Sequence, residues 1–346
     1  MSIRKRGKSY YIEKMYKGKR YSMTVSYKPT KAEADRLIFE LVNSKKDVAE
    51  GSFMDYSDKY IKSKNKILSP STIKGYETIQ KQIPYSFKNK QLRAITHEDV
   101  QLLINELAGS LKPKTVRNVS GFVSAVMRSV IKDWTSTATL PQKKVESFYV
   151  PEKDDVKAIL DYVKGTRYEI PYWLATYGLR RSEVGALLTT DLVIEETMEE
   201  TENGPELVKH NNITVNKALV QGPDKAWYVK DTKTTESNRV IQVSDYVADL
   251  IKALPPGRVY NGALHTLNEH LHLVQDKLGI ERFRLHLLRH FFASTAREIA
   301  PDAYVEYLGG WKPGSPIMKK VYDYAQKKEL DKAKQRYINK LSEMLT

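Results

Sequence analysis

The sequence of 346 residues contains no cysteine. This absence excludes disulfide bonds, thiolate zinc sites, iron–sulfur clusters and thiol nucleophiles, and it is compatible with a reducing cell interior. Long apolar runs are also missing, because stretches such as Tyr172 to Leu174 are far shorter than the roughly 20 residues that a membrane span requires. The N-terminus shows no signal-peptide pattern. We therefore expect a cytoplasmic protein that does not associate with a membrane.

Acidic residues are in the minority, with 42 Asp and Glu against 57 Lys and Arg, which gives a formal net charge of +15. A surplus of this size indicates a polyanionic partner, either a nucleic acid or an anionic membrane. No amphipathic anchor or lipidation motif accompanies the surplus, so the sequence favours nucleic acid. A hydrophobic content of 41% excludes a disordered chain, and the length is sufficient for two or three domains.

The positive charge is concentrated at the N-terminus, where residues 1–30 hold nine basic residues and one acidic residue, a net charge of +8. Seven of the nine basic residues are candidates for DNA contacts, namely Arg4, Lys5, Arg6, Lys8, Lys17, Lys19 and Arg20; the other two are Lys14 and Lys28. Strand-forming runs at 9–15 and 20–26 flank a turn at Gly18. This pattern predicts a β-hairpin.

A helix is expected directly after this hairpin. Thr30 and Glu33 form a capping-box pattern, and apolar residues follow at helical spacing. We interpret residues 1–45 as a small, β-rich DNA-binding module, with a basic arm of no fixed structure as the alternative. Residues 43–50 are typical of a linker.

Residues 52–135 have the periodicity of an all-helical domain. Its helix starts are marked by Pro70, by Thr96 with Asp99, and by Pro113. Lys112, Lys114 and Arg117 lie on or near the polar face of the helix at Pro113. They are interpreted either as contacts to DNA phosphates or as ordinary solvated charges. Residues 135–150 again have the composition of a linker.

The remaining part, residues 150–346, changes character along its length. A helix is expected near residue 151, strands and turns over 191–244, and helices beyond. Seven acidic residues lie between 191 and 206, so this strand pair is not expected to contact a phosphate backbone. An amphipathic helix from Leu330 is expected to dock either on its own domain or on a neighbouring molecule.

Four strings in this part combine residues suited to catalysis. They are Thr176–Glu183 with Arg180 after a glycine turn, Asp231–Arg239 with Lys233 in a turn, His286–His290 on one helix, and Leu308–Trp311 before a helix that holds Tyr322 and Tyr324. Each string alone has an ordinary structural explanation. A zinc site at His286 and His290 is not expected, because a third ligand and the usual adjacent glutamate are missing.

In chain order, the four strings resemble the tyrosine recombinase family, the integrases of phages and integrative elements. The family pattern contains Gly-Leu-Arg-x-x-Glu, a Thr-Lys-Thr hairpin, His-x-x-Arg-His, Gly-His or Gly-Trp, and a following tyrosine. The resemblance covers essentially the whole chain. It implies a multidomain fold, mainly α with small β-sheets: a β-rich arm-binding module (1–45), a helical core-binding domain (52–135) and a mixed α+β catalytic domain with a C-terminal helix (150–346).

The resemblance also implies roles for individual residues. By this resemblance, Arg180 and Arg289 hold the scissile phosphate, and Tyr322 is the nucleophile. Lys233 acts as the acid, His286 transfers a proton, and Trp311 contacts a phosphate oxygen. Glu183 and His290 have supporting roles. The interval from Trp311 to Tyr322 is eleven residues, slightly longer than is usual in the family. Tyr324 therefore remains a rival for the nucleophile.

The implied reaction cleaves and rejoins DNA strands through a 3′-phosphotyrosine intermediate, without a metal, cofactor or ATP, to integrate or excise a mobile element. The expected partners are double-stranded DNA at core and arm sites, further copies of the chain in a tetramer, and accessory DNA-bending or excision factors. We expect a bacterial cell that carries a phage or transposon. The alternatives are a type IB topoisomerase-like enzyme and a catalytically inactive, sequence-specific DNA-binding protein.

Overall fold

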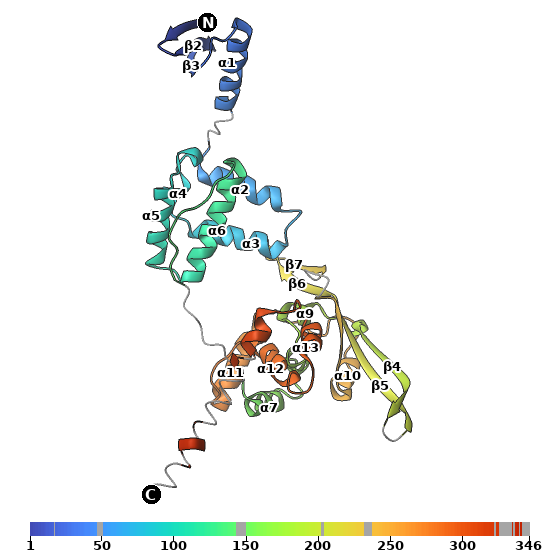
Figure 1. Ribbon diagram of the computed structural model, residues 1–346. Coiled ribbons are helices and arrows are strands. Elements are labelled where there is room, and N and C mark those ends of the chain that lie inside the picture. Colours follow the sequence, from blue (N-terminus) through green and yellow to red (C-terminus); the bar gives the residue numbers. More distant parts are fainter. Residues whose placement is uncertain are drawn as a thin grey trace. The chain divides into compact units, whose positions relative to one another are not determined.

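A computed structural model describes residues 1–16, 18–46, 51–142, 150–201, 204–231, 237–321, 323–324, 334, 336–338 and 340. The chain divides into two compact units, Met1–Lys144 and Val145–Thr346, which we describe separately (Figure 1). Three predicted site residues, Lys17, Lys233 and Tyr322, lie outside the described residues. No helix in the described ranges is both long and apolar enough to cross a membrane.

The N-terminal residues form a small sheet covered by one helix. The antiparallel strands, in the order β1-β2-β3, are β1 (Ser2–Arg6), β2 (Ser9–Tyr16) and β3 (Lys19–Val25). α1 (Lys31–Lys46) packs against one face, where Ile12, Ala34 and Ile38 are buried. The predicted β2–β3 hairpin is confirmed. The sequence pattern did not indicate β1, because basic residues fill three of its five positions.

The start of α1 confirms the predicted capping box. The Glu33 N–H donates to Thr30 Oγ1 at 3.2 Å, and the Thr30 N–H donates to Glu33 Oε2 at 3.4 Å. The helix continues to Lys46, so the linker predicted from residue 43 is wrong for its first four residues.

The rest of the first unit is a bundle of helices. They are α2 (Phe53–Lys64), α3 (Pro70–Gln82), α4 (Tyr85–Lys88), the 3₁₀ turn η1 (Leu92–Ala94), α5 (His97–Ala108) and α6 (Pro113–Val130). The three predicted helix starts are confirmed, including reciprocal capping of Thr96 by Asp99. The apolar stripe of α6, with Val119, Phe122 and Val126 buried, faces the core of this bundle.

The second unit combines helices with two small sheets. Its helices are α7 (Lys153–Tyr162), α8 (Glu169–Thr176), α9 (Arg181–Ala186), α10 (Asp245–Lys252), α11 (Thr266–Leu278), α12 (His286–Ala296) and α13 (Asp302–Gly309), with the 3₁₀ turn η2 (Thr189–Asp191). One sheet has the order β4-β5-β8, from β4 (Leu192–Thr201), β5 (Gly204–Val215) and β8 (Arg239–Gln242); the other pairs β6 (Lys217–Gln221) with β7 (Trp227–Asp231). Strands over 191–244, followed by helices, are as predicted.

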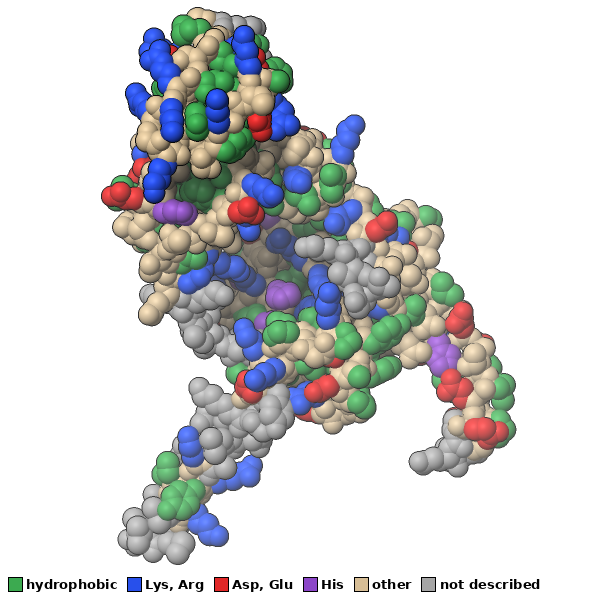
Figure 2. Space-filling model, turned by 45° about the horizontal axis from the view of Figure 1, so that its top comes forward, with side chains coloured by type: hydrophobic (Ala, Val, Ile, Leu, Met, Phe, Trp, Pro, Cys, Tyr) green, Lys and Arg blue, Asp and Glu red, His purple; other side chains and the backbone are tan. Residues whose placement is uncertain are grey.

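The β4–β5 hairpin extends well beyond the helices of its own unit (Figure 1). Its register runs from Leu192 paired with Ile213 to Thr201 paired with Gly204. Exposed acidic side chains follow its outer part (Figure 2). Its charge therefore opposes contact with a phosphate backbone, as the sequence predicts.

α8 lies at the centre of the second unit and fixes the start of the candidate site. Ile170, Tyr172, Leu174 and Ala175 on this helix are all buried. They contribute to two apolar clusters, one with α7 and α11 and the other with α10 and the β4-β5-β8 sheet. A helix packed on several sides cannot shift without opening the core, so the turn at its C-terminal end is held in place.

Candidate active site

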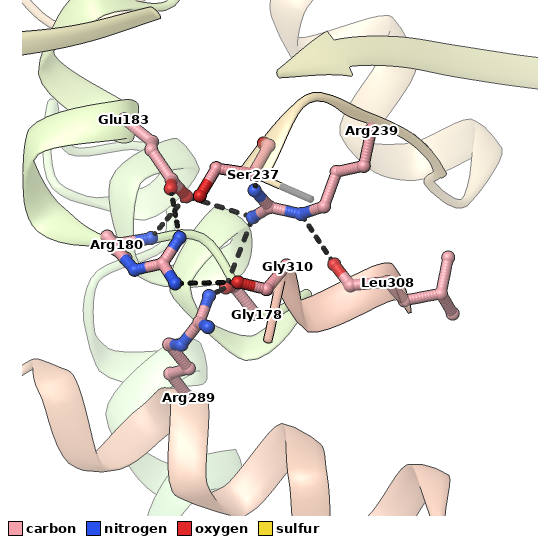
Figure 3. Close-up of polar contacts among 8 residues, drawn as sticks. All are labelled: Gly178, Arg180, Glu183, Ser237, Arg239, Arg289, Leu308 and Gly310. Carbon is pink, nitrogen blue, oxygen red and sulfur yellow. Dashed lines mark hydrogen bonds and ion pairs between the residues drawn. The ribbon is translucent and has the colours of Figure 1, made fainter. Parts of the chain in front are cut away.

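The first residue of the site, Arg180, follows a turn that only glycine accommodates. Gly178 has φ +87°, and a Cβ atom there would meet the Phe292 ring at 2.8 Å. The half-buried Arg180 side chain donates from Nη1 to Glu183 Oε1 at 2.6 Å and from Nη2 to the Gly310 carbonyl at 2.8 Å (Figure 3). The α8–α9 turn thus holds this guanidinium against the end of α13.

Arg289, the second predicted arginine, is 0% exposed on α12. Its Nη1 donates to the Gly178 carbonyl, and its guanidinium carbon lies 4.0 Å from the centroid of the Trp311 ring. Its Nε and Nη2 atoms are buried without a hydrogen-bond partner among the described residues. Burial, with Arg180 adding to it, lowers the pKa of Arg289. Buried donors left unpaired cost free energy, so this arginine is suited to an incoming anion.

A third arginine, Arg239, completes the cluster, and the sequence analysis assigned it no role. It is buried at the start of β8 and donates from Nη2 to Glu183 Oε2 at 2.9 Å and from Nε to the Leu308 carbonyl at 2.6 Å. Weaker bonds run to the carbonyls of Ser237 and Gly178. One side chain therefore ties β8 to both α9 and α13 (Figure 3).

A signal for Arg239 was present in the sequence. In β8, Arg239 and Ile241 are buried while Val240 and Gln242 are exposed. This period of two places Arg239 on the apolar side of its strand. An arginine on the inward face of a strand needs acceptors and a carboxylate, which here is Glu183.

Glu183 is the only acid in this cluster of described residues. Burial opposes its ionisation, but the guanidiniums of Arg239 and Arg180 hold the pKa of Glu183 below its usual value. The predicted supporting role corresponds to these contacts. Two guanidiniums thus pair with one carboxylate, while the neighbouring Arg289 donates to the Gly178 carbonyl. The three arginines and one carboxylate leave an excess of two positive charges, which an anion would offset.

His286 begins α12 and remains accessible to solvent. The pKa of His286 is lowered to about 4, chiefly because part of its ring is buried and secondarily because His290 and Arg289 lie nearby. The His286 and His290 ring centroids are 5.1 Å apart. A neutral imidazole at pH 7 can accept a proton, which is one of the two roles expected for His286.

We expect the pKa of His286 to rise when a phosphate group occupies the site, because a nearby anion stabilises imidazolium. In the free, folded protein the pKa of His286 is lower than in the unfolded chain. As the pH drops from 6.5 towards 4, the unfolded chain therefore binds a proton that the folded protein does not, and the free energy of unfolding falls. An NMR titration of labelled imidazoles, with His286→Gln to assign the signal, measures both values. A His286 pKa near 6.5 in the free protein would contradict the expected lowering of this pKa.

A pocket of about 360 Å³ opens beside these residues. Its lining is Arg180, Arg181, Ser182, Asn268, Arg284, Leu285 and His286. Three arginines and no acidic residue face this space. Its charge and its hydrogen-bond donors suit a phosphate group.

Trp311, at the end of the Leu308–Trp311 string, covers the buried arginine. Its ring stacks on the Phe292 ring, with the two centroids 6.4 Å apart. The same ring makes the contact with the Arg289 guanidinium that is described above. Gly310 adopts φ +60° at the C-terminal end of α13, and a Cβ atom at Gly309 would overlap the Trp311 ring at 2.1 Å. Both glycines of the string are therefore needed for this packing.

The segment after Trp311 leads to the two candidate nucleophiles. Residues 316–321, 323 and 324 are helical, as predicted. Tyr322 lies outside the described residues. The hydroxyl of the partly buried Tyr324 donates to the Val150 carbonyl at 3.4 Å. The rival tyrosine is thus engaged with the backbone at the start of the second unit.

Comparisons with known proteins concern the fold of the chain. Residues 52–108 match the family model described as phage integrase, N-terminal SAM-like domain. The solved Tn1549 transposon integrase in complex with a circular intermediate DNA is similar over 81% of this chain and 99% of that chain, at 15% identity and a TM-score of 0.60. A lambda integrase dimer bound to a COC′ core site is similar over 92% of this chain and 94% of that chain, at 14% identity and a TM-score of 0.58. The chain has the tyrosine recombinase fold. Among curated proteins, none matches the sequence.

In the first unit, three of the predicted DNA-binding residues lie on the open face of the N-terminal sheet. Arg4, Arg6 and Arg20 are exposed and alternate with residues that face α1. Arg6 also lies 4.8 Å from the centroid of the Tyr11 ring. Lys5 and Lys8 are exposed too, and the side chain of Lys19 is not among those described.

The three basic candidates at the start of α6 differ from one another. Lys112 and Lys114 are exposed and open to a partner. Arg117 is partly buried and donates from Nη2 to the Pro141 carbonyl at 2.7 Å. This contact ties the chain beyond α6 back onto the bundle, so Arg117 has a structural task that the sequence did not indicate. No group of three His, Asp or Glu side chains within the described ranges is arranged to hold a metal ion.

Proposed function

We propose that the protein is a site-specific DNA recombinase that integrates or excises a mobile element through a 3′-phosphotyrosine intermediate. One observation carries the proposal: Arg180 and Arg239 pair with the single carboxylate of Glu183, and Arg289, which shares the Gly178 carbonyl with Arg239, keeps two buried N–H donors unpaired among the described residues. Such a cluster is built for an anion whose charge grows during the reaction. The scissile phosphodiester is that anion.

In the proposed reaction, the Tyr322 hydroxyl attacks phosphorus while the bond to the 5′-oxygen breaks. Arg180 and Arg289 hold the non-bridging oxygens, where negative charge builds up in the transition state. Neutral His286 accepts the tyrosine proton, and Lys233 protonates the leaving 5′-oxygen. The products are a 3′-phosphotyrosine and a free 5′-hydroxyl, and attack by a second 5′-hydroxyl reverses the steps.

The guanidinium groups supply the charge stabilisation that a metal ion provides in other phosphoryl-transfer enzymes. The energy of the phosphodiester is kept in the tyrosyl bond. We therefore propose a reaction that needs neither a metal ion nor ATP, with its direction set by assembly and by accessory DNA-bending or excision factors.

DNA binding is assigned to both ends of the first unit. The open face of the β1-β2-β3 sheet carries Arg4, Arg6 and Arg20, and β-strands can read the major groove of DNA, which supports an arm-site module. Lys112 and Lys114 on α6 suit phosphates of the core site. The compared structures include the Tn1549 integrase in complex with DNA and a lambda integrase tetramer bound to a Holliday junction.

Self-association into a tetramer on DNA follows from the reaction, because one active site cuts one strand. The C-terminal residues 334, 336–338 and 340 are helical, and Tyr337 and Ile338 are 67% and 52% exposed. Exposed apolar side chains on a terminal helix suit docking onto a neighbouring molecule. We propose docking in trans over docking on its own domain.

The proposal is tested with a nicked duplex from an end of the element that carries the gene. In EDTA, we expect a covalent protein–DNA adduct on a denaturing gel, located by peptide mapping. Exchange of strands between two duplexes, rather than relaxation of supercoils alone, separates a recombinase from a type IB topoisomerase. Tight binding without an adduct on DNA from both ends would instead indicate a binding protein.

Removal of residues 1–45 should leave cleavage at the core site intact and impair integration, since the arm module is a separate fold with its own core. Replacing Arg4, Arg6 and Arg20 together by Ala in the full chain should have the same effect. Replacement of Arg36, an exposed arginine on the opposite side in α1, is the matched control. Normal integration by the truncated protein would exclude the arm-site assignment.

A further inference from the structure

A buried carboxylate on α13 lies outside the arginine cluster and has no role in the steps above. Glu306 is 6% exposed. Its Oε1 accepts the Ser315 N–H at 2.8 Å, and its Oε2 accepts the Gly314 N–H at 3.2 Å. No salt bridge to Glu306 occurs among the described residues. Its partners are therefore the backbone of the loop that follows Trp311.

The backbone of Glu306 holds the other end of the same loop. Its carbonyl accepts the N–H groups of Gly310 and Trp311, the latter at 2.8 Å. One residue thus binds the chain where it leaves α13 and again four residues later at Ser315. The loop between these points, Lys312–Ser315, is where the longer interval between Trp311 and Tyr322 is accommodated.

The loop leads directly into the helical residues 316–321, which immediately precede the predicted nucleophile in the chain. The Ser315 carbonyl accepts the Met318 N–H at 3.0 Å, so the first turn begins at the residue that Glu306 holds. Met318 and Val321 are buried against the cluster that contains Phe292 and Val305. Tyr322 is the next residue in the chain.

The chemistry of this loop explains why it needs a fixed point. It contains Pro313 and Gly314. Gly314 adopts φ +69°, and because glycine populates positive and negative φ about equally, this residue does not hold that conformation by itself. Two hydrogen bonds to a carboxylate are charge-assisted and stronger than neutral ones. A glutamine in the same place puts an NH2 group, which is a donor, where one of the two carboxylate oxygens stands, so one of the two N–H groups loses its acceptor.

We propose that Glu306 is a positioning residue for the nucleophile: by holding Gly314 and Ser315 it sets the place of the helix that delivers Tyr322 to the phosphate. The inference rests on the proposed function and adds to it a residue that touches neither DNA nor the reacting atoms. It separates two parts of the site. The arginine cluster activates the phosphate, and Glu306 fixes the tyrosine.

The test measures single-turnover cleavage of the nicked duplex by the full chain. Glu306→Gln should slow formation of the tyrosyl adduct by on the order of 10- to 100-fold, because displacement of a reacting group by about 1 Å has effects of this size. DNA affinity should change little, and the thermal unfolding temperature should fall by a few degrees, as for the loss of one buried hydrogen bond. Glu298→Gln, the same change on an exposed carboxylate after α12, is the matched control.

A second measurement separates positioning from general damage. In a Tyr322→Phe background, hydrogen peroxide serves as a small nucleophile: its oxygen forms the new bond to phosphorus, and the 5′-oxygen leaves with a proton. This cleavage depends on the arginine cluster and not on the tyrosine helix. Adding Glu306→Gln should leave it unchanged, whereas adding Arg180→Ala should abolish it.

Three results would count against the inference. An unchanged adduct rate in Glu306→Gln, or equal losses in the tyrosine and peroxide reactions, would overturn it while leaving the proposed function intact. An absence of adduct with the unaltered protein would overturn the proposed function and this inference together. A slower adduct with an unchanged peroxide reaction supports both.

Discussion

Replacing Tyr322 by Phe is expected to abolish the covalent adduct and leave DNA binding unchanged. The change removes one oxygen, the atom that would form the bond to phosphorus, and no other residue in the proposed mechanism can replace it. Strand cleavage should fall below detection, a loss limited only by the assay. The measurement is a denaturing gel with the nicked duplex, and a mobility shift on the same DNA records binding.

Tyr324→Phe is the matched control for this prediction. The Tyr324 hydroxyl donates to the Val150 carbonyl, so its loss should cost about 1 kcal/mol of stability, as for a typical hydrogen bond, with the adduct retained. The reverse pattern, an adduct in Tyr322→Phe and none in Tyr324→Phe, would make Tyr324 the nucleophile. It would leave the proposed reaction in place and correct its site.

Arg289→Met should lower the cleavage rate on the order of 10²- to 10³-fold, as for loss of a donor to a developing oxyanion. Its effect on stability should be small or even favourable, because the free protein buries two N–H donors of this arginine unpaired among the described residues. The substitution should thus lower the cleavage rate without lowering the free energy of unfolding. Single-turnover cleavage and thermal unfolding of the same preparation measure them.

Arg239→Met is the matched comparison, since it removes the same charge from the same cluster. Arg239 is bonded to Glu183, Leu308 and two further carbonyls, so its loss should destabilise the fold by about 3 kcal/mol or more, the usual effect of breaking a buried ion pair. If Arg289→Met unfolds the protein as readily as Arg239→Met, Arg289 is a structural residue and the assignment of the phosphate site fails.

The sequence indicated the site residues whose roles depend on short strings. Arg180, Arg289 and Glu183 are brought together through Gly178 and Gly310, both of which belong to strings that were recognised. Helix starts were also predictable, since a capping pair such as Thr96 and Asp99 acts over three residues. Lys17, Lys233 and Tyr322 stay predictions, because they lie outside the described residues.

Residues that act across long intervals were harder to predict. Arg239 reaches Leu308 over 69 positions, and nothing local marks that contact beyond the alternation of a four-residue strand. Arg117 reaches Pro141 over 24 positions, so its polar helix face suggested a free cation. Glu306 resembled any acid on an amphipathic helix until the Gly314–Ser315 loop was seen to fold back onto it.

The acidic β4–β5 hairpin gives the second unit an uneven distribution of charge, with carboxylates along this hairpin and three arginines lining the pocket beside His286. In the field of a DNA duplex such a molecule experiences a torque before it makes contact. The hairpin is repelled and the pocket is attracted, so a larger share of encounters arrives in a productive orientation. An association rate that falls steeply with added salt, and a smaller share of productive encounters when the hairpin glutamates become glutamine, would be the kinetic consequences of this charge distribution.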